Sequence, residues 1–172
     1  MSTAAIDPNA TRQTNFANMS AALTGFTIDV IDPLFDPLGL VAAYLQTADD
    51  KAKPTDVDSL IQQYLTLLNS GLTNQQIADR LLDTSNPKPD PPVLLARAIV
   101  TMWYLGSWYS YNTPPPITPA VVSQNAYIGG LAWKAMQAHP MGASDFTFGY
   151  WEQPPPSLTD FGVDTANGGK HA

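Results

Sequence analysis

The longest apolar stretch of the chain, PVLLARAIVTMWYLGSWY over residues 92–109, places the strongest constraint on the fold. It carries a charged Arg97 near its middle and supplies only about 17 residues, whereas a membrane-spanning helix needs about 20. A helix that is apolar around most of its circumference must instead be surrounded by other parts of the protein. We therefore expect residues 92–109 to form a buried helix at the centre of a bundle.

Apolar residues spaced three and four positions apart predict further amphipathic helices on both sides of this segment. Capping residues mark several of the starts: Asp36 precedes Pro37, Thr55 precedes a long apolar stripe, and Thr73 with Gln76 forms a capping box. We find no convincing strand alternation. The expected helices span residues 15–30, 37–50, 56–70, 74–83, 92–109 and roughly 119–138.

These elements indicate an all-α fold, an irregular bundle of about five to six helices. We expect a flexible N-terminus at residues 1–13, the helical bundle domain at 14–138, and an extended C-terminal tail at 139–172 that is rich in proline and aromatic residues. Gly129 and Gly130 weaken the last helix, and we expect them to let another backbone segment approach closely.

The tail begins with HPMGASDFTFGYWEQPPP, residues 139–156, in which aromatic rings are followed by prolines that exclude a helix or a paired strand. Aromatic rings favour burial, although the tail offers no regular framework to bury them. Charged residues make up only 13% of the chain, against roughly 25% in an average domain. We infer that a partner covers part of the surface. The expected contacts in the tail include Phe146, Phe148, Tyr150 and Trp151.

The motif WYLGSWY, residues 103–109, places two tryptophans and two tyrosines around one glycine. Trp103 and Trp108 fall on different faces of a continuous helix, so these rings cannot all face one core. One interpretation is a core helix with surface tyrosines. The other places one face in the core and the opposite face, with Trp103, Tyr104, Trp108 and Tyr109 as candidates, against a partner, where Trp and Tyr concentrate binding energy.

Groups suited to catalysis are sparse in this sequence. There is no cysteine, which removes thiolate nucleophiles, iron–sulfur clusters and thiolate zinc sites. The net charge of −7 disfavours binding to nucleic-acid phosphates or anionic lipids. His139 could act as a general base or a metal ligand, but its position at an expected helix end favours capping of the last turn. His171 lies in the terminal GGKHA.

Two sets of carboxylates could also carry chemistry. Asp29, Asp32 and Asp36 could be imagined as a calcium cluster, but they lack the alternating oxygens of a calcium loop. Two of the three precede a proline, which favours a role in turns and caps. The second set consists of Asp145, Glu152 and Asp160. Nothing in the tail fixes the separation of these three, so a paired acid and base is not favoured.

WYLGSWY, followed by VVSQNAYIGGLAWKAMQAHPMGASDFTFGYWEQPPPSLTDFG, resembles the small subunit of membrane-associated FAD-dependent sugar and polyol dehydrogenases. These are the gluconate, sorbitol and fructose dehydrogenase complexes and the related bacterial glucose dehydrogenase. The segments LTGF and DPLGLVAAYLQTA also look like the family, so the similarity covers nearly the whole chain. The residues that match the family pattern are Trp103–Gly106, Tyr127, Trp133, His139, Pro140, Phe148–Trp151 and Pro154–Pro156.

This resemblance implies a chain without a catalytic residue, cofactor site or metal site of its own. The implied partner is a large flavoprotein subunit of the glucose-methanol-choline type, which holds FAD and oxidises the sugar or polyol. A third subunit, a multi-haem c-type cytochrome, usually passes the electrons onward. The family's small subunit helps the large one to mature, remain stable and be exported. Tyr127, Trp133 and His139 join the expected partner contacts on this basis.

The resemblance also implies a location in the periplasm, peripheral to the inner membrane. Family small subunits typically carry a twin-arginine export signal, which MSTAAIDPNATRQTN at the start of this chain does not resemble, so a cytoplasmic location stays open. Some relatives have a cysteine that links the two subunits; here the association is expected to be non-covalent. Two alternatives remain: a dissociable chaperone or export escort for that flavoprotein, and a free-standing enzyme that uses His139 and a tail carboxylate.

Overall fold

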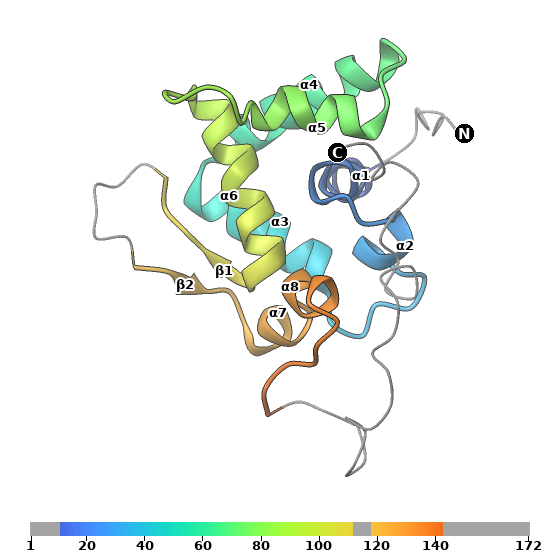
Figure 1. Cartoon of the computed structure of the whole chain (residues 1–172), viewed down its shortest axis with the longest axis vertical. Helices are drawn as coiled ribbons and strands as arrows, with labels where there is room; N and C mark the ends of the chain where they lie inside the picture. The colour runs from blue at the N-terminus through green and yellow to red at the C-terminus, as the bar shows by residue number, and fades with distance from the viewer. Residues whose placement is uncertain (1–10, 112–117, 143–172) are drawn as a thin grey trace, which may run out of the picture.

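The computed structural model describes residues 11–111 and 118–142, which fold mostly into helices (Figure 1). Two very short strands pair beside them. The all-α fold class predicted from the sequence is therefore confirmed. The helices are α1 (Arg12–Thr24), α2 (Ile28–Ile31), α3 (Leu40–Lys51), α4 (Pro54–Asn69), α5 (Asn74–Leu82), α6 (Pro91–Leu105), α7 (Gln124–Ile128) and α8 (Leu131–Ala135), and the strands are β1 (Ser107–Trp108) and β2 (Ala120–Val121).

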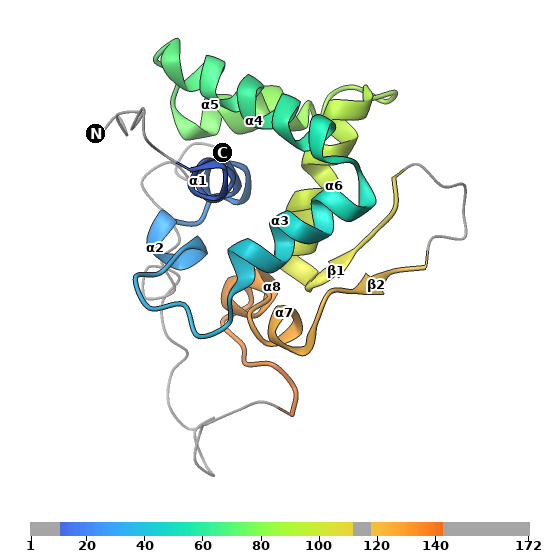
Figure 2. The same ribbon diagram turned by 180° about the vertical axis from the view of Figure 1, so that it is seen from behind.

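Helix α6 is the central helix, as predicted from its apolar sequence. Helices α1, α3, α4 and α5 all pack against it, and α3 lies behind α6 in Figure 1 and in front of it in Figure 2. Leu95, Ile99 and Met102 on α6 are each at most 1% exposed. Among the described residues, no helix combines the length and the apolar character needed to cross a membrane. The apolar surface of α6 is buried against the other helices of the bundle.

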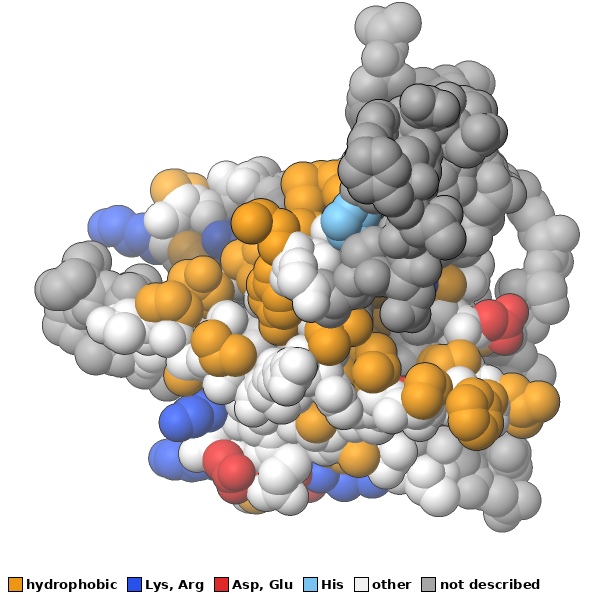
Figure 3. All heavy atoms as spheres, turned by 90° about the horizontal axis from the view of Figure 1, so that it is seen from below, with side chains coloured by type: hydrophobic (Ala, Val, Ile, Leu, Met, Phe, Trp, Pro, Cys, Tyr) orange, Lys and Arg blue, Asp and Glu red, His pale blue; other side chains and the backbone are white. Residues whose placement is uncertain are grey.

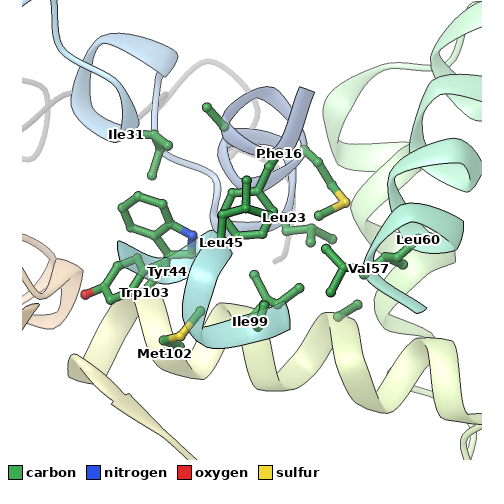
Figure 4. Packing of buried hydrophobic residues seen from close by; sticks show 14 of the residues in the cluster. Phe16, Leu23, Ile31, Tyr44, Leu45, Val57, Leu60, Ile99, Met102 and Trp103 are labelled. Carbon is green, nitrogen blue, oxygen red and sulfur yellow. The ribbon is translucent and has the colours of Figure 1, made fainter. Parts of the chain in front are cut away.

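The centre of the core lies between α1, α3 and α6 (Figure 4). Trp103 of α6 and Tyr44 of α3 meet edge to face, with ring centroids 4.5 Å apart and planes inclined by 79°. Both side chains are enclosed, and burial raises the pKa of the Tyr44 hydroxyl. That hydroxyl lies 3.4 Å from the carbonyl oxygen of Ala126 and donates to it. Tyr44 therefore connects the core to α7, which carries part of the candidate site.

The continuous helix predicted over residues 15–30 is wrong, because the chain breaks at Gly25 between α1 and α2. Gly25 has a left-handed φ of 78°, and its N–H donates to the carbonyl oxygen of Ala21 at 3.1 Å. Phe26 follows the break and is only 4% exposed. Phe26 is not helical, but it occupies the core position that a continuous helix would fill next. The spacing of apolar residues therefore continues across Gly25, and periodicity alone does not reveal the break between α1 and α2.

Helix α3 begins at Leu40, three residues later than the sequence predicted. Gly39 precedes it with a left-handed φ of 63°. Asp36 does not cap a helix that starts at Pro37; its Oδ1 accepts hydrogen bonds from the backbone N–H groups of Leu38 at 3.0 Å and Gly39 at 2.9 Å. The turn role predicted for Asp36 is confirmed, and the predicted helix start is wrong.

Helices α4 and α5 form the predicted helical hairpin, and both contact α6. Helix α4 begins at Pro54, so Thr55 lies in its first turn and not at the N-cap. Thr73 and Gln76 form the predicted capping box, in which each side chain accepts a hydrogen bond from the other residue's backbone N–H, at 3.3 Å and 3.0 Å. Local sequence signals therefore fix the start of α5 closely.

The largest departure from the predicted fold follows α6. In place of the single helix expected over residues 119–138, the chain forms β2, α7 and α8. Strands β1 and β2 are antiparallel, with Ser107 opposite Val121 and Trp108 opposite Ala120. The strand pair returns the chain toward the end of α6, where α7 and α8 then pack.

Glycines allow this close return of the chain. A Cβ atom at Gly106 would lie 2.5 Å from the carbonyl oxygen of Ala126, and one at Gly130 would lie 2.9 Å from the carbonyl oxygen of Tyr104. Real Cβ atoms essentially never approach an atom within 3.0 Å. The expected close approach of another backbone segment is therefore confirmed at Gly130, whereas Gly129 faces the side chains of Leu40 and Leu38.

Arg97, the charge within the apolar α6, binds the end of a neighbouring helix. Its Nε donates to the carbonyl oxygen of Leu82 at 2.8 Å and its Nη2 to that of Asp83 at 2.5 Å, at the C-terminus of α5. We expect Arg97→Ala to lower the free energy of unfolding by about 1–3 kcal/mol, because two carbonyls lose a charged donor. Urea denaturation measures this loss. Arg97→Lys should restore only part of the lost free energy of unfolding, since lysine lacks the planar guanidinium that donates to both carbonyls. If Arg97→Ala kept the original stability, these two hydrogen bonds would not contribute to holding α5 against α6.

Candidate partner-binding surface

One end of the fold exposes a group of large apolar side chains, which we call the α7–α8 surface. Its elements meet because β2 pairs with β1 directly after α6, and because α7 and α8 contact α6. In Figure 3, which views the molecule from below, hydrophobic side chains cover much of the described part and charged side chains lie toward its edges. The α7–α8 surface consists of Leu105, Val121, Tyr127, Met136 and Met141, which are 37% to 77% exposed.

Tyr127 and Trp133 form an aromatic pair on α7 and α8. Their ring centroids are 5.4 Å apart at an angle of 79°, and the indole Nε1 of Trp133 donates to the carbonyl oxygen of Tyr127 at 2.8 Å. Tyr127 is 37% exposed and Trp133 is half-buried. Because the hydrogen bond and the ring contact hold both side chains in place, a partner that docked here would cost them little conformational entropy.

Trp103 and Trp108 do not belong to this surface, although the sequence suggested both as partner contacts. They are 1% and 4% exposed and belong to the main hydrophobic cluster. The helix ends before Gly106, so Trp108 lies on β1 and can face the core together with Trp103. The prediction that these two side chains contact a partner is therefore wrong.

Tyr104 and Tyr109 are half-buried. The Tyr104 hydroxyl donates to the carbonyl oxygen of Thr24 at 3.0 Å, and its ring lies edge-on to Phe26 with centroids 6.1 Å apart. Burial raises the pKa of the Tyr104 hydroxyl. Tyr104 thus holds the end of α6 against α1, and a partner contact by the exposed parts of Tyr104 and Tyr109 stays a prediction.

His139 does not cap the last helical turn as the sequence predicted. Helix α8 ends at Ala135, and His139 lies four residues beyond it, half-buried, with its Nδ1 3.3 Å from the carbonyl oxygen of Pro140. Asp29, Asp32 and Asp36 do not form a metal-binding group, and no other such group of three or more His, Cys, Asp or Glu occurs among the described residues. His139 does lie close in sequence to Met136 and Met141, and its partner contact stays a prediction.

Several predicted residues lie outside the described part of the chain. They include the tail aromatics and the carboxylates that were considered as an acid–base pair. The residues concerned are Phe146, Phe148, Tyr150, Trp151, Asp145, Glu152, Asp160 and His171.

A small pocket lies between the starts of α4 and α6. It has a volume of about 130 Å³ and is lined by Asp56, Ser59, Pro91, Pro92, Leu95 and Tyr111. Ligand pockets in proteins typically measure about 300–1,000 Å³. This pocket is therefore too small to enclose a sugar or a flavin, and the α7–α8 surface is the better candidate site.

Sequence reasoning missed most of the exposed apolar side chains. Met136 and Met141 follow the last helix, Leu105 is the last residue of α6, and Val121 lies in β2. None of them therefore belongs to a regular helical stripe of exposed residues. Leu34 and Phe35 were also missed; they are 109% and 83% exposed. A signal was present in DPLFDPLG, residues 32–39, where two prolines interrupt an apolar run.

Comparison with known proteins does not assign this chain to a family. No family model matches the chain, and searches of curated proteins and of solved structures gave no match. The surface and the sequence motifs therefore carry the functional inference.

Proposed function

We propose that this chain is a non-catalytic accessory subunit that binds, stabilises and helps to mature an FAD-dependent sugar or polyol dehydrogenase. The observation that carries the proposal is the α7–α8 surface, a group of exposed apolar side chains beside a fixed aromatic pair. Exposed apolar patches of this kind mark protein–protein contact sites. The resemblance of the motifs in residues 103–162 to the family's small subunit supplies the identity of the partner.

Composition and geometry support the same proposal. The chain carries few charges, 13% of its residues, which suits a protein with part of its surface covered. Arg97, the charge in the longest apolar helix, is engaged by backbone carbonyls and is explained without a catalytic role. Docking of the α7–α8 surface would remove apolar area from water, which favours association.

Co-expression tests the proposal directly. The chain is produced together with the flavoprotein whose gene lies nearest to its own, and the purified material is measured by sizing chromatography and flavin absorbance. We expect a complex, and more soluble FAD-loaded flavoprotein than when that subunit is expressed alone. Absence of a complex would overturn the proposal. A complex that separates once FAD is bound would favour the dissociable chaperone.

The double variant Met136→Ser/Met141→Ser should weaken this complex. Both side chains are more than 60% exposed, so their loss leaves the core intact but removes apolar area that the partner would cover. We expect the dissociation constant to rise roughly tenfold or more. Turnover per bound flavin should stay unchanged, because the variant touches no reacting group.

The matched control is Gln62→Ala/Gln63→Ala, which shortens two exposed side chains on α4. It should leave both binding and turnover as in the original chain. If the methionine variant lowered turnover per flavin as much as the yield of the complex, the purely structural role would be excluded.

A further inference from the structure

A second apolar feature lies in the link between α2 and α3, away from any helix face. Leu34 and Phe35 are 109% and 83% exposed, the two largest exposed fractions among the described large hydrophobic residues. Two adjacent apolar side chains this exposed are unfavourable in water unless something else covers them. We call them the Leu34–Phe35 tip. Figures 1 and 2 both place this link at the periphery of the molecule, beside α2.

The tip is held in place from both sides. Before it, Ile31 is 1% exposed and packs in the core. After it, Asp36 Oδ1 accepts two backbone hydrogen bonds, and the carbonyl oxygen of Leu38 accepts one from Asn125 Nδ2 of α7 at 3.2 Å. Pro33 and Pro37 restrict the backbone on either side of the two residues. Anchoring of this kind lowers the entropy lost on docking.

The charged residues next to the tip in the sequence are acidic. Asp29 is exposed and Asp32 is half-buried, and in the described part of the chain neither carboxylate has a hydrogen-bond or ion-pair partner. No lysine or arginine lies between Arg12 and Lys51 in the sequence, and the chain as a whole carries a net charge of −7. This field repels anionic lipid headgroups and attracts a positively charged protein surface.

We propose that the Leu34–Phe35 tip inserts into an apolar pocket of the partner protein, and that basic side chains of the partner line the rim of that pocket. The inference rests on the proposed function, since it takes the flavoprotein subunit as the partner. It adds a second contact, separate from the α7–α8 surface, and states its chemistry: two apolar side chains enter the pocket, while Asp29 and Asp32 pair with its rim.

Two variants of the full-length chain test the proposal. Leu34→Ser/Phe35→Ser removes the apolar side chains and leaves Asp36 to hold the turn. Asp29→Asn/Asp32→Asn removes the charges and leaves the tip. Binding of each to the purified neighbouring flavoprotein is measured at low and high salt, and circular dichroism checks that each variant is folded. Gln62→Ala/Gln63→Ala serves again as the control.

We expect Leu34→Ser/Phe35→Ser to raise the dissociation constant at least roughly 100-fold, because two large apolar side chains lose their burial. Asp29→Asn/Asp32→Asn should raise it by about a few fold at low salt and flatten its salt dependence. If the original chain binds and the tip variant binds equally well, the tip inference is overturned and the proposed function stands. If the original chain does not bind, both are overturned.

Vesicles distinguish a lipid surface from a protein pocket. The original chain is mixed with vesicles of phosphatidylcholine alone and with vesicles that also contain an anionic lipid. We expect no binding to either. Binding that disappears in Leu34→Ser/Phe35→Ser would assign the tip to a membrane surface and overturn the inference.

Discussion

Trp103→Ala should remove a large share of the chain's stability, which is the largest effect of a single substitution that we expect. Trp103 is 1% exposed and lies edge to face with Tyr44, so its removal opens a cavity between α3 and α6. Replacing a buried tryptophan by alanine costs about 3–5 kcal/mol. The total stability of a domain is only about 5–15 kcal/mol. Circular dichroism during urea or thermal denaturation measures the loss.

Trp103→Phe is the control for this experiment. The buried indole Nε1 has no hydrogen-bond partner within the described residues. Phenylalanine removes that unsatisfied donor and keeps an aromatic ring against Tyr44, so part of the lost packing is offset. We expect a much smaller loss than for alanine. A Trp103→Ala protein with the original stability would show that this side chain is not in the core.

Gly106→Ala is expected to have the second largest effect and to act on the α7–α8 surface. Gly106 has a left-handed φ of 64°, and a Cβ atom there would lie 2.5 Å from the carbonyl oxygen of Ala126 and 2.8 Å from the backbone nitrogen of Tyr127. Alanine therefore combines an unfavourable backbone conformation with a clash against α7. We expect a loss of more than about 2 kcal/mol in the free energy of unfolding.

Gly39→Ala separates the two contributions. Gly39 has nearly the same φ, 63°, but a Cβ atom there meets nothing within 4 Å. Alanine at this position should cost only the left-handed conformation, about 1–2 kcal/mol. The difference between the two variants in urea denaturation measures the close approach of α7 to the end of α6. Equal losses would mean that α7 is not packed against Gly106.

The parts of the fold that the sequence predicted are those with local causes. The capping box of Thr73 and Gln76 lies within four residues, and the apolar circumference of α6 is evident within one segment. The failed prediction of a helix over residues 119–138 has a distant cause. The backbone there turns at Gly130, which packs against the carbonyl oxygen of Tyr104 at the end of another helix. No pattern within residues 119–138 contains that contact.

The candidate site was harder to predict than the fold, because it depends on which side chains point outward, and residue type does not fix that direction. Residue type predicted a group of aromatic partner contacts, but Trp103 and Trp108 are buried while Tyr127 is partly exposed. Leu34 and Leu38 each follow an Asp-Pro pair, yet Leu34 is fully exposed and Leu38 packs against the core. The same Asp-Pro-Leu sequence gives different burial because Leu38, unlike Leu34, lies against α7, at Asn125 and at Gly129.

The packing of α1 against α5 and α6 has a consequence for synthesis on the ribosome. Helix α1 is made first, but α6 ends about 80 residues after it, which at roughly 5–20 residues per second takes about 4–16 s. During that interval Phe16, Met19 and Leu23, all at most 5% exposed in the finished fold, have no completed core to enter. The nascent chain therefore exposes these apolar side chains to water until α6 emerges and the core can close.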